Sequence, residues 1–114
     1  MLSKEKRLNL KKDFKWVASG SKLESKYCKV FLRFGKNQMS KVGIAASAKF
    51  FKKSSQRNRA RRLVSAALEQ IYSKLPGNIN IVVLPKQGVL DVKSSDVLLD
   101  LEGFLENKNE KSLT

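Results

Sequence analysis

The sequence predicts an α+β fold, an α/β sandwich in which helices pack on one mixed sheet. An apolar content of 41%, spread over periodic segments, is typical of a folded domain and not of a basic tail. Two segments, 27–34 and 41–47, alternate with the period of two that strands require, and two others, 54–75 and 92–105, carry apolar residues at helical spacing. The predicted order of elements is αββαβα.

The first half is expected to hold one short helix and two strands. Residues 11–19 form a helix with one apolar side, ended by Gly20. Residues 22–34 contain the clearest strand, and from position 27 its side chains alternate between one face and the other: Tyr27, Lys29, Phe31 and Arg33 against Cys28, Val30, Leu32 and Phe34. After a turn over residues 35–38, residues 41–47 form a second strand. The short connection makes it the antiparallel partner of the first.

The second half is expected to complete the core. Ser54 or Ser55 caps a helix that runs to about Leu75 and is ended by Pro76-Gly77. Its apolar stripe consists of Ala60, Leu63 or Val64, Ala67, Ile71 and Leu75. The apolar run Ile79–Leu84 predicts a buried central strand. A last helix over 92–105 directs one set of side chains inward: Val97, Leu98, Leu101, Phe104 and Leu105.

The net charge of +14 is held unevenly along the chain. Residues 1–62 carry 19 basic and 3 acidic side chains, a net +16, whereas residues 63–114 carry 5 and 7, a net −2. No acidic residue occurs between Glu24 and Glu69, an interval with twelve Lys or Arg. Such a distribution attracts polyanions, so we expect a nucleic-acid-binding surface built from the first half.

Four of the six arginines lie within six consecutive positions, Arg57–Arg62. A guanidinium can bind a phosphate with two hydrogen bonds, and the start of a helix favours an anion through its N–H groups and dipole. A solvated basic helix face is the alternative, but close arginines repel by several tenths of a kcal/mol per pair unless an anion lies among them. The predicted nucleic-acid-binding residues are Arg57, Asn58, Arg59, Arg61 and Arg62, with Lys49, Lys52 and Lys53 from the preceding loop.

A second candidate surface combines aromatic and cationic side chains. The strand face of Tyr27, Lys29, Phe31 and Arg33 would stack unpaired bases and bind the phosphates between them. The alternative is that both faces of the strand are buried and Phe31 belongs to the core. Phe14 and Trp16 on the first helix present the same choice between a stacking platform and packing.

The composition excludes several functions. The chain has no histidine, which removes the commonest general base and zinc ligand, and its carboxylates form no tight cluster. A self-sufficient nuclease is therefore not expected. The single cysteine, Cys28, excludes an internal disulfide and suits a reducing cytoplasm, and no stretch reaches the roughly 20 apolar residues of a membrane span.

Taken together, these residues resemble the protein subunit of bacterial ribonuclease P. The resemblance covers residues 7 to 105. Its motifs are Arg7-Leu8, Asp13-Phe14 with Val17, the strand from Lys41 to Ser47 with Lys49, Arg57-Asn58-Arg59 with Arg61-Arg62-Leu63, Asn80-Ile81-Val82-Val83, and Lys86 with Gly88. The arginine–asparagine–arginine signature is short, and the strands at the expected distances on both sides make it specific.

The resemblance implies a protein cofactor of a ribozyme that matures the 5′ end of tRNA in the bacterial cytoplasm. In this family a large RNA with bound Mg²⁺ performs the cleavage, so no catalytic residue, metal site or bound cofactor is expected in the protein. Its partners would be the ribonuclease P RNA and precursor tRNA, with no membrane and no obligatory protein partner. The helix with Arg57–Arg62 would face the catalytic RNA, and a cleft between the first helix and the sheet would hold the 5′ leader, with Phe14, Trp16 and the Phe31 face as candidates. The resemblance also implies a left-handed β-α-β crossover, an exception to the usual right-handed rule.

We therefore expect a single RNA-binding domain over residues 1–114, with mobile ends at 1–6 and 108–114. A small basic ribosomal protein is the main alternative, because it would share size, charge and fold class. A DNA-binding regulator is disfavoured, because the arginine helix carries a long apolar stripe and nothing indicates a dimer.

Overall fold

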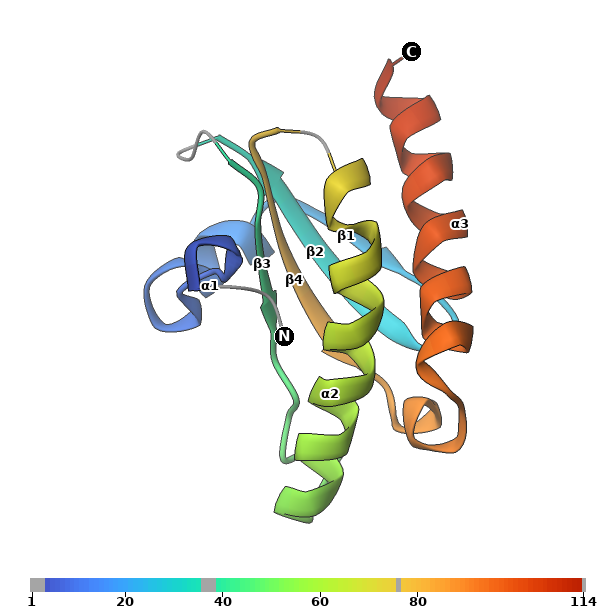
Figure 1. Cartoon of the computed structure of the whole chain (residues 1–114). Coiled ribbons are helices and arrows are strands. Elements are labelled where there is room, and N and C mark those ends of the chain that lie inside the picture. Colours follow the sequence, from blue (N-terminus) through green and yellow to red (C-terminus); the bar gives the residue numbers. More distant parts are fainter. Residues whose placement is uncertain (1–3, 36–38, 76, 114) are drawn as a thin grey trace.

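The computed structural model describes the backbone of residues 4–35, 39–75 and 77–113, and the side chains of residues 5–35, 39–75 and 77–103. The chain forms one four-stranded sheet with three α-helices (Figure 1), which confirms the α+β class. In chain order the elements are α1 (Leu10–Ala18), β1 (Ser21–Glu24), β2 (Cys28–Phe34), β3 (Lys41–Ile44), α2 (Ser54–Ile71), β4 (Ile79–Pro85) and α3 (Ser94–Leu113), with short 3₁₀ turns at Lys4–Lys6, Tyr72–Lys74 and Gln87–Asp91. No helix in the described ranges is long and apolar enough to cross a membrane.

The strands are ordered β1-β2-β4-β3 in the sheet. β2 pairs with β4 in antiparallel register from Cys28↔Pro85 to Phe34↔Ile79, and β3 pairs with β4 in parallel. The prediction that β3 is the antiparallel partner of β2 is therefore wrong, because β4 lies between them. The physical reason is burial: six of the seven residues of β4 are buried, and a strand that is apolar on both faces is best covered in the middle of a sheet. The prediction of a buried central strand is confirmed.

The unit β3-α2-β4 connects two neighbouring parallel strands. In Figure 1 both strands run downward, β4 lies to the right of β3, and α2 passes in front of them. This arrangement is a left-handed crossover, as the resemblance implies. It carries α2, with its arginines, to the face of the sheet opposite α1.

β1 is an additional strand at the edge of the sheet. The segment 22–34, expected as one strand, is divided by a turn after Glu24, in which the Ser25 N–H donates to the Cys28 carbonyl (2.8 Å). The Asp100 carboxylate of α3 accepts hydrogen bonds from the N–H groups of Lys26 (3.1 Å) and Tyr27 (3.0 Å). Local alternation could not reveal this turn, because the acceptor lies more than seventy residues further along the chain.

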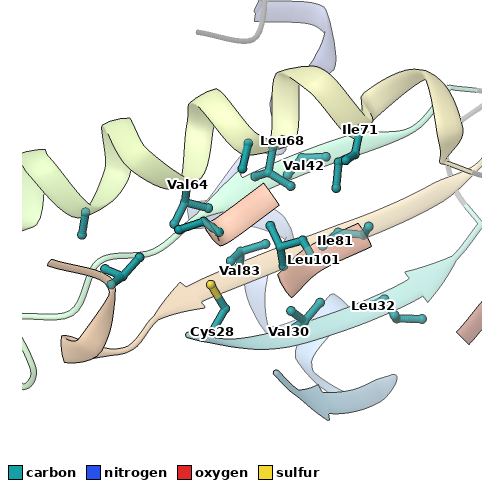
Figure 2. Close-up of a cluster of buried hydrophobic side chains, with 14 of the residues drawn as sticks. Cys28, Val30, Leu32, Val42, Val64, Leu68, Ile71, Ile81, Val83 and Leu101 are labelled. Carbon is teal, nitrogen blue, oxygen red and sulfur yellow. The ribbon is translucent and has the colours of Figure 1, made fainter. Parts of the chain in front are cut away.

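The larger part of the core lies between the sheet and the pair α2 and α3. Figure 2 shows Val64, Leu68 and Ile71 of α2 directed toward the sheet, where they meet buried side chains of β2, β3 and β4, with Leu101 of α3 beside them. Cys28 is fully buried in this cluster, and burial raises the pKa of its thiol to about 12. On the opposite face a smaller cluster joins Val17 of α1 with Leu8 and Val82.

The helix boundaries differ modestly from the predicted ones. α2 ends at Ile71 and continues as a 3₁₀ turn to Lys74, and its apolar stripe has Val64 buried and Leu63 only half-buried. α3 starts at Ser94 and continues to Leu113, so the predicted end at Leu105 is wrong. Val97 and Leu101 are buried as predicted. The side chains of Phe104 and Leu105, residues 36–38 of the expected turn, Pro76, and the end positions 1–3 and 114 lie outside the described residues.

Asn80 fixes the end of β2. Its side chain is fully buried, and its Nδ2 donates to the carbonyl oxygens of Arg33 (3.2 Å) and Gly35 (2.8 Å). Gly35 has a φ of +115°, a conformation that other residues rarely adopt. This contact holds the chain as it leaves β2 and fixes the backbone of Arg33 beside α1.

Candidate nucleic-acid interface

Arg57 has a structural role at the start of α2. Its Nη1 donates to the carbonyl oxygens of Phe51 (2.8 Å) and Lys52 (3.3 Å), and the ring of Phe51 is fully buried. The guanidinium therefore anchors the loop between β3 and α2. That loop exposes Lys49, Lys52 and Lys53.

The other predicted residues of α2 face outward to different degrees. Asn58, Arg59 and Arg62 are exposed, whereas Arg61 is half-buried and donates from Nη2 to Asn58 Oδ1 (2.8 Å). Four residues line a hollow of about 410 Å³ at this end of the helix: Ser55, Asn58, Arg61 and Arg62. We call the set of Lys49, Lys52, Lys53, Asn58, Arg59, Arg61 and Arg62 the α2 surface.

The N-terminus of α2 strengthens the positive character of this surface. The N-cap residue is Lys53, so the prediction of Ser54 or Ser55 as the cap is wrong. The Lys53 N–H donates to Gln56 Oε1 (3.4 Å), but a lysine ammonium cannot itself accept a hydrogen bond from the first turn. The first turn carries no acidic residue. The free N–H groups of this turn and the positive end of the helix dipole therefore favour an anion near the arginines.

The second candidate surface lies between α1 and the sheet. The rings of Phe14 on α1 and Phe31 on β2 meet edge to face, with centroids 6.3 Å apart and planes at 65°. Both residues are half-buried, so Phe31 supports the small core cluster and also presents part of its ring to solvent. The Nζ of Lys22 on β1 lies 5.9 Å from the Phe31 centroid. An aromatic pair bordered by a cation is the kind of site that binds an unpaired base and its phosphate.

Trp16 and Arg33 form a separate aromatic–cation pair. The Arg33 guanidinium lies 4.8 Å from the Trp16 ring centroid, and its Nη1 donates to the Trp16 carbonyl (3.2 Å) and to Ser19 Oγ (2.7 Å). These bonds tie the end of α1 to the end of β2. The β2 partners of the two rings, Phe31 and Arg33, are two residues apart and therefore share one face of the sheet, whereas Phe14 and Trp16 project from different sides of α1.

Tyr27 does not share the face of Phe31, contrary to the prediction. It belongs to the turn before β2, and its ring packs against the large core cluster beside Gly88. Tyr27 lies in the turn to which Asp100 is hydrogen-bonded, before β2 begins at Cys28, so it does not take part in the alternation of side chains along the strand. Lys29 does lie on β2, half-buried, with its Nζ 6.0 Å from the Phe50 ring. We call Phe14, Trp16, Lys22, Lys29, Phe31 and Arg33 the α1 surface.

Lys22 is the residue of this surface that the sequence reasoning missed. It faces Phe31 because β1 pairs with β2 in the register Lys22↔Phe31. In the sequence, Lys22 lies in a polar stretch before the alternating strand, and this stretch alone did not indicate a strand. Its position beside Phe31 follows only from the pairing of β1 with β2.

Two further residues of the resemblance have structural contacts. The Lys86 ammonium bridges Glu24 Oε1 (2.7 Å) and the Ser25 carbonyl (2.8 Å), and its hydrogen bond lowers the pKa of the Glu24 carboxyl below the usual value. Gly88 lies beside the Tyr27 ring. Among the described residues, no group of three His, Cys, Asp or Glu is placed to hold a metal ion.

The fold and these two basic surfaces define a small α+β domain of the kind that binds polyanions. The sequence model of the Ribonuclease P family matches residues 2–109, and the chain belongs to that family. It is 34% identical over 91 residues to the ribonuclease P protein component of Nitrosococcus oceani, a match that covers 79% of this chain and 76% of the relative.

Solved structures agree with the family match. The ribonuclease P protein of Thermotoga maritima superposes with a TM-score of 0.77 at 27% identity, covering 89% of this chain and 96% of that one. The ribonuclease P protein of Staphylococcus aureus shares the fold, with a TM-score of 0.74 at 19% identity over 90% of this chain and 94% of that one. The chain is thus a protein subunit of ribonuclease P and a partner of the ribonuclease P RNA. Neither comparison favours the alternative of a small ribosomal protein.

Proposed function

We propose that the α2 surface binds the catalytic RNA and that the α1 surface binds the single-stranded 5′ leader of precursor tRNA. The observation that carries this division is their placement: α1 covers one face of the sheet and α2 the other (Figure 1). One domain can therefore bind two RNA segments at the same time without competition between them.

The α2 surface suits a structured RNA. Exposed guanidiniums and ammonium groups neutralise phosphates wherever the backbone of the RNA presents them, independent of base sequence. If about six phosphates are neutralised, the logarithm of the binding constant should fall with the logarithm of salt concentration with a slope of about −4 to −5. Arg57 contributes indirectly, because it holds the loop that carries Lys52 and Lys53.

The α1 surface suits a single strand. Each base stacked on an aromatic ring is worth about 1–3 kcal/mol, and stacking tolerates any base. The rings of Phe14 and Phe31 and the adjacent Lys22 provide one such position, and Trp16 with Arg33 provides another. Lys29 adds a cation along the same face.

In this proposal the protein orients substrate and the RNA performs the cleavage. The basic and aromatic side chains of the two surfaces bind phosphates and bases, and Mg²⁺ held by the RNA supplies the chemistry. By reducing repulsion between catalytic RNA and precursor, the protein should tighten substrate binding and lower the Mg²⁺ concentration required. We place this activity in the bacterial cytoplasm, where a reduced Cys28 is stable.

Reconstituted cleavage of a precursor tRNA at low Mg²⁺ tests the proposal. Accurate 5′ cleavage that needs both the ribonuclease P RNA and this protein is the expected result. Cleavage by the protein alone would contradict it, and so would an absence of stimulation by folded protein with its cognate RNA.

A further inference from the structure

A second cavity, of about 210 Å³, lies at the β3 edge of the sheet. Its walls come from the segment before α1, from β3 and from α2. Arg7 forms an isolated parallel bridge with Val42, and the Leu8 N–H donates to the Val42 carbonyl (3.0 Å). Backbone pairing therefore sets the position of this wall. We use the name β3-edge cavity for the space lined by Arg7, Leu8, Leu10, Val42, Gly43, Ile44, Arg61 and Ser65.

The floor of the β3-edge cavity is apolar. Leu8 and Val42 are buried, and Leu10 is half-buried above Gly43. A Cβ at Gly43 would lie 2.7 Å from Leu10 Cδ2, so only glycine lets the leucine lie this close to the strand. The result is an apolar wall of the kind that lines sites for small molecules.

The rim of the cavity is cationic. Arg7 is exposed and Arg61 is half-buried, and none of the lining residues is acidic. Asn58 Oδ1 accepts a hydrogen bond from Arg61 Nη2 (2.8 Å) and so orients the guanidinium. Arg61 also lines the hollow at the start of α2, so the β3-edge cavity adjoins the α2 surface.

The edge of β3 adds hydrogen-bonding groups. The Val42 carbonyl is directed outward to Leu8, whereas the Ala45 N–H is directed inward to the Val83 carbonyl (2.9 Å). Because successive residues of a strand direct their peptide groups to alternate sides, Ile44 directs its N–H and C=O outward. Ile44 lines the cavity, so these groups lie where the edge of a base would be read.

We propose that the β3-edge cavity receives one unstacked nucleotide of the catalytic RNA. The base lies against Leu10 and Gly43 with its edge toward Ile44, and its phosphate lies between Arg7 and Arg61. The volume is below the roughly 300 Å³ at which sites for larger ligands begin, so it fits one base and not two. The inference rests on the proposed function, because the nucleotide belongs to the RNA that the α2 surface binds.

Two substitutions separate the base contact from the phosphate contact. Ser65 is buried in the cavity wall, and Ser65→Leu fills the space without changing any charge. We expect its affinity for the ribonuclease P RNA to fall by about tenfold, which corresponds to about 1.4 kcal/mol of lost apolar contact with the base, with an unchanged salt slope. Arg7→Gln should weaken binding and reduce the magnitude of the slope by about one. Lys12→Gln, an exposed lysine of α1 outside the cavity, should bind as the unmodified protein does.

The outcomes distinguish this inference from the proposed function. If Ser65→Leu, shown to be folded by its thermal melt, binds RNA normally while Arg59→Ala does not, the cavity proposal fails and the α2 surface stands. If Arg59→Ala also binds normally, the proposed function itself fails. Weakening by Arg7→Gln alone would show a phosphate contact without a bound base and would overturn the inference.

A measurement on the unmodified protein covers the case in which Ser65→Leu does not fold. Titration with millimolar uridine 5′-monophosphate should move the backbone amide NMR signals of Gly43, Ile44 and Ser65. Signals that move only at the start of α2 would contradict a base site in the cavity.

Discussion

Replacing Arg59 by alanine should weaken assembly with the catalytic RNA without destabilising the fold. Arg59 is exposed in the second turn of α2, and its removal exposes no buried group. A hydrogen bond to a charged group is worth about 1.5–3 kcal/mol, which corresponds to a loss of about 10- to 150-fold in affinity. Because one phosphate contact disappears, the salt slope should decrease in magnitude by about one.

Lys74→Ala is the matched control for this experiment. It removes the same charge beyond the other end of α2, where Lys74 pairs with Glu102 at 3.8 Å. A rise of 1.5 Å per residue places the two positions about 22 Å apart, more than twice the Debye length of about 8 Å at physiological salt. Filter-binding or fluorescence titrations over a range of salt concentrations would measure both variants. Equal losses in the two variants would refute a localised α2 surface and leave only a general effect of net charge.

Three further predictions follow from individual contacts. Arg57→Ala should lower the free energy of unfolding by about 1–3 kcal/mol in denaturant titrations, because the carbonyls of Phe51 and Lys52 lose their donor; an unchanged stability would show that the loop does not need this anchor. Phe14→Leu should reduce affinity for precursor tRNA and leave affinity for leaderless tRNA unchanged, whereas Phe34→Leu, at an exposed phenylalanine outside both surfaces, should change neither. Cys28 should resist alkylation in the folded protein at neutral pH and react on unfolding, since burial raises its pKa to about 12; because the folded state retains this proton to higher pH than the unfolded state, its contribution to stability is present below about pH 9 and is lost as pH rises toward 12.

Local patterns were sufficient to predict the three α-helices, although not the N-cap of α2 or the end of α3. The arginines of Arg57–Arg62 lie at the start of a helix as predicted, because the apolar stripe of that helix and its position after a polar loop are local signals. Ile79 to Leu84 was recognised as a central strand because it is apolar on both faces. These features depend on short-range periodicity, which a single sequence displays directly.

The features that sequence reasoning missed depend on contacts between distant segments. Several strand pairings were compatible with the sequence. The short connection between β2 and β3 favoured direct pairing of these two strands, whereas β4 lies between them. Asp100 of α3 forms the turn that removes Tyr27 from the α1 surface and creates β1. Arg57 appeared equivalent to its neighbours until its bonds to the loop carbonyls distinguished it. Composition predicted that basic side chains gather in the first half of the chain, and tertiary contacts determine which of them are exposed.

The most direct test of two independent RNA-binding surfaces is a comparison of precursor and leaderless tRNA as ligands of the reconstituted enzyme. Binding should be measured for holoenzymes that contain the unmodified protein, Arg59→Ala or Phe14→Leu, with the protein at saturating concentration. We expect the unmodified protein to strengthen binding of the substrate with a leader more than binding of leaderless tRNA. Phe14→Leu should remove part of that gain, and Arg59→Ala should retain it once the RNA is saturated. An equal gain for leaderless tRNA, or loss of the leader effect in Arg59→Ala at saturation, would contradict the division of function between the two faces of the sheet.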